Sequence, residues 1–302
     1  MVNSGMYKDT KHGNLDCHIH ILPPGRTSGL VRWIKKSFPE HPSREDMTPE
    51  DILEDLRECG VGTVFNLVFP LREEETDFLN EFSRELAASH DGIVPFGSLH
   101  IETPRKDEVA ERCLTELGLA GIKLHPYAQR FEAFSPAFEP MFRKLNELKR
   151  PFIVHTGFDV FYGKTQDLEY LGGILEGYPE MPVVLVHSLF PRLELALSLM
   201  KRHELLYLDM TNVIACVKYY LDDPGFWASQ AGFEDVPDSF DHFYRILDGF
   251  SDRVMFGTDH PAGMGSPRTI YDDFASFNFN EDISSNLLGG TARRFLRLHC
   301  GY

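Results

Sequence analysis

Short apolar stretches alternate with amphipathic stretches through nearly the whole 302-residue chain. The apolar stretches have the length and the β-branched content of buried strands. They lie at residues 14–20, 61–69, 92–99, 120–125, 151–155, 182–187, 205–211 and 253–258. The amphipathic stretches have helical spacing and lie at residues 48–60, 74–89, 104–117, 135–148, 166–176, 191–203, 241–250, 270–277 and 284–298. Because strands that alternate with helices form a parallel sheet, the chain is predicted to be an α/β protein.

Eight strand–helix units predict a (β/α)8 TIM barrel, formed by one domain over residues 1–302. The competing architecture is an open doubly wound sheet. We favour the barrel because no G-x-G-x-x-G follows the first strand and no P-loop fingerprint is present. Two long loops are expected, at about 21–47 and 212–240, and long loops usually carry function. In the second loop, Phe226, Trp227 and Phe233 are candidates for a substrate lid, for packing over the helices or for a subunit contact.

Charge and cysteine usage limit the partners and the compartment. The formal net charge of -16 argues against nucleic acid and anionic membranes, since both require a basic surface. The acidic balance itself says little about the substrate. We expect a small-molecule substrate, and a homo-oligomer is compatible with the sequence. The five cysteines are scattered and form no C-x-x-C pair, and no apolar run reaches the roughly 18 residues of a spanning helix. These features predict a cytoplasmic protein with reduced thiols.

Histidines gather where the predicted strands end. Seven of the 13 histidines lie at or just past a strand end, namely His18, His20, His100, His125, His155, His187 and His260. Lys123 and Asp259 lie at strand ends too. In a (β/α)8 barrel the carboxyl ends of the strands form the face that carries active sites. These side chains are therefore expected to meet at one end of the barrel.

Alternation along the strands predicts which side chains share a face. On the first strand, Asp16, His18 and His20 should share one face, and Leu15, Cys17 and Ile19 the other. On the sixth strand, the same rule places Val183 and Leu185 with His187, and on the eighth it places Met255 and Gly257 with Asp259. Two neutral imidazoles on one strand face suit a divalent metal ion such as zinc.

The motifs together resemble those of a known family. Asp16-Cys17-His18-Ile19-His20, Gly121-Ile122-Lys123-Leu124-His125-Pro126, Val154-His155-Thr156-Gly157, Val186-His187-Ser188 and Gly257-Thr258-Asp259-His260-Pro261 resemble, in this order, the amidohydrolase-2 branch of the metal-dependent amidohydrolase superfamily. The resemblance extends from residue 14 to the segment at 290–296. It implies a (β/α)8 barrel that binds one or two divalent ions, with His18, His20, His155 and Asp259 as ligands. It also implies that His187 binds a second ion or acts as a catalytic acid or base.

Lys123 decides between one ion and two. Family members with two metals often bridge them with a carboxylated lysine or a glutamate on the fourth strand, where this chain has Lys123. An uncarboxylated ammonium would repel cations, and would then bind a substrate carboxylate or lie away from the ion without contacting it. We expect one ion, most readily zinc, and two ions if Lys123 is carboxylated.

The predicted function is hydrolysis of an amide, ester or lactone-type bond in a small molecule. A metal-activated water attacks, Asp259 acts as the general base, and His187 polarises the carbonyl. Lys123 is a third candidate catalytic residue, and His125 and Arg130 are candidates for binding the substrate, with Arg26 and Arg32 on the first long loop. The alternatives are a metal-dependent non-oxidative decarboxylase of an aromatic or unsaturated carboxylic acid, which the same branch contains, and a barrel that binds metal without catalysis.

Overall fold

The computed structural model of the chain describes residues 13–132, 134–157, 162, 168, 170–223, 236 and 239–301. Phe226, Trp227 and Phe233 lie outside the described residues. The helices are α1 Pro24–Ser37, α2 Pro49–Arg57, α3 Thr76–Ser89, α4 Lys106–Thr115, α5 Pro126–Gln129, α6 Glu139–Leu148, α7 Leu171–Gly177, α8 Leu193–Arg202, α9 Val213–Asp222, α11 Phe240–Asp248, α12 Pro267–Ser276, α13 Glu281–Ser285 and α14 Thr291–Phe295. Shorter helical turns are η1 Glu73–Glu75, η2 Pro136–Phe138, η3 His187–Leu189, η4 Ser251–Arg253, η5 Asn286–Gly290 and η6 Leu296–Cys300.

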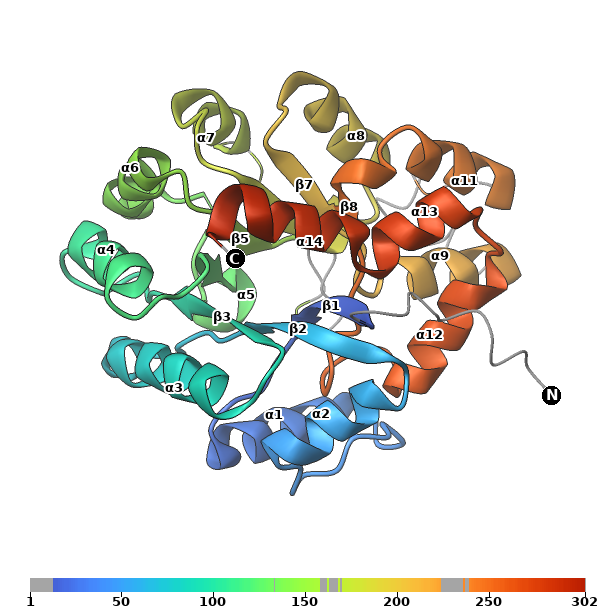
Figure 1. The fold of residues 1–302 in the computed structure, drawn as a ribbon, viewed down its shortest axis with the longest axis horizontal. Helices are drawn as coiled ribbons and strands as arrows, with labels where there is room; N and C mark the ends of the chain where they lie inside the picture. Colours follow the sequence, from blue (N-terminus) through green and yellow to red (C-terminus); the bar gives the residue numbers. More distant parts are fainter. Residues whose placement is uncertain are drawn as a thin grey trace.

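Eight parallel strands form the barrel predicted from the sequence, with helices between them (Figure 1). The strands are β1 Asn14–Ile19, β2 Val61–Leu67, β3 Ile93–Ser98, β4 Ile122–Leu124, β5 Phe152–His155, β6 Val183–Val186, β7 Leu206–Asp209 and β8 Val254–Met255. Each strand pairs with the next in chain order. The last strand segment returns to the first, because Ile19 forms a parallel bridge with His260 and the Cys17 N–H donates to the Phe256 carbonyl at 3.0 Å. This pairing closes the ring.

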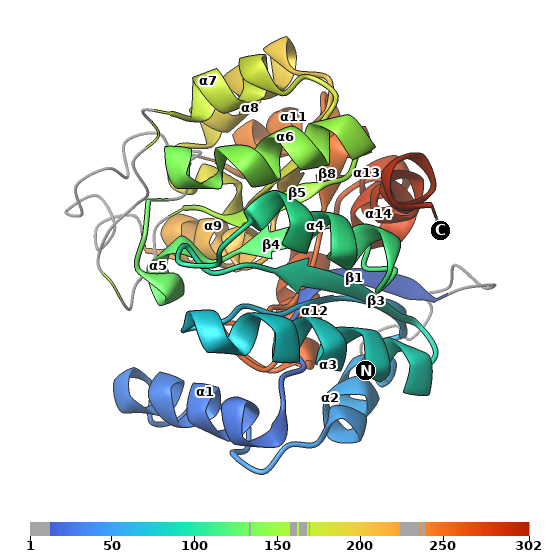
Figure 2. The same ribbon diagram turned by 90° about the vertical axis from the view of Figure 1, so that its left-hand side faces the viewer.

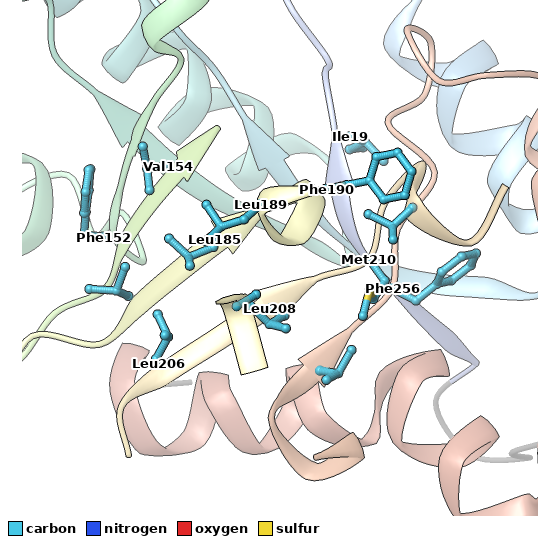
Figure 3. Close-up of a cluster of buried hydrophobic side chains, with 14 of the residues drawn as sticks. Ile19, Phe152, Val154, Leu185, Leu189, Phe190, Leu206, Leu208, Met210 and Phe256 are labelled. Carbon is cyan, nitrogen blue, oxygen red and sulfur yellow. The ribbon is translucent and has the colours of Figure 1, made fainter. Parts of the chain in front are cut away.

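Two layers of apolar side chains hold the barrel. Alternate residues fill its interior, among them Phe65, Phe96, Ile153, Val184 and Met255. The intervening residues face the helices, and Figure 3 shows part of that layer, including Phe152, Val154, Leu185, Leu206 and Leu208. A strand covered on both sides is apolar on both faces, which is the pattern seen in the sequence.

The C-terminal segment closes the end of the barrel opposite the site. Phe295 of α14 packs in the interior cluster, with its ring 4.9 Å from that of Tyr207. The segment predicted as one helix at 284–298 is interrupted at Gly289, which has φ +136. A Cβ at Gly289 would lie 2.9 Å from the Leu15 backbone nitrogen, so the close approach of this segment to β1 requires glycine.

The first long loop contains a helix, which the sequence interpretation missed. Within residues 21–47, α1 begins at Pro24 and buries Thr27, Val31 and Ile34 on one face. The Pro23-Pro24-Gly25 sequence reads as a turn, but proline is favoured at the first position of a helix. The start of α2 agrees with the prediction: Thr48 and Asp51 form a reciprocal capping box. The second loop, predicted at 212–240, begins with helix α9 in its described part. No helix among the described residues is long and apolar enough to cross a membrane.

Candidate metal centre

Three side chains converge at the carboxyl ends of β1 and β8. The Nε2 atoms of His18 and His20 lie 3.2 Å apart. Oδ1 of Asp259 lies 3.5 Å from the first of these nitrogens and 3.1 Å from the second. All three residues are buried. Among the described residues, this is the one group of His, Cys, Asp or Glu side chains close enough to share an ion.

The separations fit one divalent ion. Donor atoms about 2.0–2.1 Å from a tetrahedral ion lie about 3.3 Å from one another, close to the observed spacing. The outer ring nitrogens have partners that set the tautomers. His20 Nδ1 lies 2.6 Å from the Leu67 carbonyl, which only accepts, and His18 Nδ1 lies 2.8 Å from Asp209 Oδ2. Nδ1 therefore carries the proton, and both Nε2 lone pairs face each other, an arrangement that a cation stabilises.

A break in the alternation of β1 brings His18 and His20 to the site. Leu15 and Cys17 point into the barrel interior, whereas Ile19 packs toward the helices. The prediction that these three side chains share a face is therefore wrong. The pairing register of β1 with β2 shifts between Asp16 and Ile19, and such a bulge re-aims the side chains that follow it.

Asp16 is not part of the group formed by His18, His20 and Asp259, which we call the cluster. Its carboxylate accepts from the backbone N–H of His18 at 2.9 Å and from the Thr258 hydroxyl at 2.6 Å. The bond from Thr258 joins β1 to the segment that follows β8. Burial raises the pKa of Asp16 to about 7. Gly257 makes this contact possible, since a Cβ there would lie 2.7 Å from Asp16 Oδ1.

His187 reaches the same region by an unexpected route. Val184 and Val186 face the interior, and Val183 and Leu185 face the helices. The prediction that Val183 and Leu185 share a face with His187 is therefore wrong. His187 begins a left-handed turn with φ +58, which redirects its side chain past the strand end. Its ring stacks at 5.5 Å from that of His18, and Nδ1 lies 2.7 Å from the Thr211 carbonyl. That carbonyl only accepts, so Nδ1 donates and Nε2 is the atom left for chemistry.

His155 and His125 extend the histidine cluster across β4 and β5. The His155 ring lies 4.5 Å from that of His187 and stacks on His125 at 4.0 Å. His125 Nδ1 also accepts from the Ala128 N–H at the start of α5. Burial lowers the pKa of His18, His125 and His155 well below the usual value for imidazole. All three rings are thus neutral, the form that binds metal.

Asp259 is held as an anion. Burial alone would raise the pKa of Asp259, but the polar and positively charged groups around it, among them Lys123, lower that pKa below its ordinary value. Asn212 donates to its second oxygen, Oδ2, at 2.9 Å. The carboxylate therefore presents Oδ1 to the cluster in a fixed orientation.

Lys123 is completely buried on β4. Its Nζ has no hydrogen-bond partner among the described residues. Burial lowers the pKa of this ammonium to about 8, although the charges of Asp209 and Asp259 raise it. The charges of Asp209 and Asp259 therefore act on Lys123 at a distance, without a hydrogen bond from Nζ to either carboxylate.

Arg130 lies apart from the other predicted site residues. It is exposed just past α5, and no contact in the described part of the chain joins it to the histidines. Arg26 is paired with Glu75 at 2.6 Å, and Arg32 is exposed on α1. Substrate binding by Arg130 stays a prediction.

Sequence reasoning missed Asp209. This carboxylate ends β7, is 1% exposed, and accepts from the Thr211 N–H at 2.8 Å as well as from His18. It is the partner that orients the His18 ring. The rule that selected the histidines, a polar residue at a strand end, applies equally to Asp209.

The comparisons with known proteins identify the family of the chain. A model of the amidohydrolase family matches residues 15–298. The chain belongs to this family, whose metal-dependent enzymes include hydrolases and decarboxylases. No curated protein matches the chain.

Solved structures share the fold at low identity. An uncharacterised TIM-barrel protein from Bordetella bronchiseptica is 20% identical, with a TM-score of 0.69 over 96% of this chain and 99% of that one. A 2,6-dihydroxybenzoate decarboxylase complexed with 2,6-dihydroxybenzoate is 14% identical, with a TM-score of 0.65 over 95% and 99%. A 5-carboxyvanillate decarboxylase from Novosphingobium aromaticivorans, solved with bound manganese, is 13% identical, with a TM-score of 0.64 over 96% and 98%.

Proposed function

We propose that this amidohydrolase is a hydrolase that cleaves an amide, ester or lactone-type bond in a small molecule, using one divalent ion. The observation that carries the proposal is the convergence of His18 Nε2, His20 Nε2 and Asp259 Oδ1 within ion-binding distance of one another. We propose His155 as a further ligand because the family resemblance implies it, although the group of converging side chains is formed by His18, His20 and Asp259 alone among the described residues. Imidazole and carboxylate donors suit zinc, although the manganese-bound decarboxylase shows that the fold accommodates other ions.

A divalent ion in this site supplies Lewis acidity and lowers the pKa of water. The protein residues supply the proton transfers and the orientation. Asp259 takes the proton from the attacking water, and Asn212 keeps the carboxylate aimed at it. His187 hydrogen-bonds the scissile carbonyl through Nε2, because Nδ1 is held by Thr211.

Decarboxylation of an aromatic or unsaturated acid is the second candidate. Two observations favour it: the decarboxylases among the similar structures, and the buried Lys123 ammonium. An ammonium without a partner in the described residues would be stabilised by a substrate carboxylate. In this reading Lys123 binds the anion and is not carboxylated.

The two reactions leave different isotopic products. We would load the metal-free protein with zinc, confirm one ion per chain by elemental analysis, and screen lactones, amides and aromatic acids in H₂¹⁸O. Hydrolysis predicts one ¹⁸O atom in the product and no CO₂. Release of CO₂ with an unlabelled organic product would replace our proposal with the second candidate.

The setting of the enzyme is also a proposal. All five cysteines are free thiols in the structure, which supports a cytoplasmic location. We propose a small-molecule substrate and no nucleic-acid or membrane partner, on the basis of the net charge of -16. A homo-oligomer remains compatible with these features.

A further inference from the structure

The turn that carries His187 consists of three consecutive residues in the left-handed backbone region. His187, Ser188 and Leu189 have φ values of +58°, +51° and +58°. None of them is glycine, and a side chain disfavours this conformation, so the turn is strained. Strain of this kind persists only where neighbouring groups hold the backbone in place. The contacts around the turn therefore determine where the His187 side chain lies.

One hydroxyl spans the turn from its beginning to its end. Thr156, which follows β5, donates from Oγ1 to the Val186 carbonyl just before the turn at 2.6 Å. The same oxygen accepts from the Leu189 N–H at the end of the turn at 3.2 Å. Because Thr156 is completely buried, bulk water does not compete for these bonds. Thr156 thus joins both ends of the left-handed turn to the end of β5.

Further contacts hold the middle of the turn. Ser188 Oγ donates to the Asp209 carbonyl at 2.9 Å, which ties the turn to the end of β7. The loop after β5 approaches closely at Gly157, where a Cβ would lie 3.1 Å from the His187 Cβ. The Leu189 side chain is buried in the layer between the barrel and its helices (Figure 3). The turn is therefore fixed from both neighbouring strands, β5 and β7.

The position of the His187 ring follows from this turn. The ring stacks 5.5 Å from that of His18, and Nδ1 lies 2.7 Å from the Thr211 carbonyl. The backbone angles of a residue set the direction in which its side chain leaves the chain. If the turn relaxed to ordinary backbone angles, the ring would leave both contacts. The groups that hold the turn therefore hold the imidazole.

We propose that Thr156 and Ser188 are positioning residues for His187. Their hydroxyls hold the left-handed turn, and the turn holds the imidazole beside His18 with Nε2 available to the substrate. Both hydroxyls are engaged in hydrogen bonds to the backbone, so they act through His187 and not on the substrate. The effect on turnover rests on the proposed function, in which His187 polarises the scissile carbonyl, whereas the position of the ring does not.

Kinetics separate the two side-chain groups of Thr156. Thr156→Val removes the hydroxyl and keeps the shape of the side chain. In the zinc-loaded enzyme it should lower kcat at least about tenfold and change KM less than about threefold, because a displaced His187 loses an interaction that is made mainly in the transition state. Zinc content by elemental analysis should be unchanged. Thr156→Ser, which keeps the hydroxyl, should retain kcat within about threefold of the wild type.

A spectroscopic measurement tests the position of the ring without turnover. The Nδ1–H of His187, bonded to the Thr211 carbonyl, gives a downfield imidazole resonance in ¹⁵N-labelled protein, which is assigned by its loss in His187→Gln. Thr156→Val and Ser188→Ala should each shift or broaden this resonance, and Thr156→Ser should retain it. Ser188→Ala provides the test if Thr156→Val does not fold. No substrate is needed, so a failed isotope experiment would reject the proposed hydrolysis and leave this result standing.

Thr291→Val is the matched control. Thr291 is also completely buried, donates to the Ser251 carbonyl at 2.8 Å and accepts from Arg294 at 2.9 Å. It lies in α14, which Figure 2 shows on the opposite side of the molecule from α5 and α9. This variant should lower the melting temperature, as Thr156→Val does, but keep kcat and the His187 resonance of the wild type. An unchanged resonance in folded Thr156→Val or in Ser188→Ala, a Thr156→Ser variant as impaired as Thr156→Val, or an equal loss of kcat in Thr291→Val overturns the proposal.

Discussion

Replacing Asp209 with asparagine should weaken metal binding without unfolding the barrel. Asp209 uses one oxygen for His18 Nδ1 at 2.8 Å and the other for the Thr211 N–H at 2.8 Å. Asparagine has the same size but only one acceptor. If its oxygen faces Thr211, its NH₂ group opposes the Nδ1–H of His18 and favours the tautomer with a proton on Nε2. If its oxygen faces His18, the NH₂ group opposes the Thr211 N–H.

The size of the effect follows from the role of such partners. Loss of a carboxylate that orients a ligand histidine lowers metal affinity about 10- to 100-fold. That range corresponds to about 1.4–2.7 kcal/mol of binding free energy. Calorimetric titration of the metal-free protein with zinc, or competition with a chelating dye, measures the change, and far-UV circular dichroism establishes that the fold persists.

Asp55→Asn provides the control for this substitution. Asp55 accepts from His260 Nε2 at 3.1 Å, so it forms the same kind of pair outside the ion cluster. Its replacement should leave zinc affinity unchanged. Wild-type zinc affinity in a folded Asp209→Asn protein would show that the Asp209 contact does not orient His18, and the tautomer argument would then be incorrect.

Four further substitutions probe separate parts of the structure. Asp259→Asn should lower kcat about 100- to 10,000-fold in steady-state assays, and wild-type turnover with metal retained would exclude Asp259 as the base. His187→Gln should lower kcat at unchanged metal content by elemental analysis; parallel loss of the ion would make it a ligand instead. Lys123→Met should stabilise the metal-free protein by up to about 3 kcal/mol at pH 7, because the folded-state pKa of about 8 lies below the ordinary 10.5. The buried ammonium lowers the stability of the wild type below pH 8, and this cost disappears as the pH rises from 8 to 10.5. Urea denaturation should therefore show that the extra stability of Lys123→Met decreases between pH 8 and pH 10.5. Extra stability that does not change with pH would refute the lowered pKa of Lys123. Gly289→Ala should destabilise the barrel by more than 1 kcal/mol, since φ is +136 and a Cβ would collide with the Leu15 backbone; an unchanged melting temperature would contradict this.

The two sequence rules used to locate the site differed in reliability. The first rule, that polar residues at strand ends meet at one end of the barrel, correctly predicted that His20, His155, His187 and Asp259 lie in one region. It succeeds because all parallel strands of a closed barrel end at the same face, whatever their local register. It needs only the approximate end of each strand. Alternation needs the register of every residue. It correctly grouped His18 with His20, but it was wrong for Asp16 and Ile19 on β1 and for His187 on β6.

Both errors have local backbone causes that the residue types do not reveal. On β1 the register shift lies among Asp16 to Ile19, a stretch without glycine or proline to signal a bulge. On β6 the redirection occurs at His187, Ser188 and Leu189, three consecutive residues with positive φ. Residues other than glycine rarely adopt this backbone conformation, and the sequence His-Ser-Leu contains nothing that favours it.

Functional sites are where such departures from local preference concentrate, since the surrounding structure maintains a conformation that the chain would not choose alone. Here the departures have a specific effect. The bulge in β1 lets two histidines on one strand direct both Nε2 atoms to a single point, and the turn after β6 brings a third imidazole over them. A regular β1 that continued the alternation of Leu15 and Cys17 would turn both His18 and His20 toward the helices. The histidine spacing therefore predicts that His18 and His20 lie together, while the bulge and the turn determine that these two rings and that of His187 meet at the same end of the barrel.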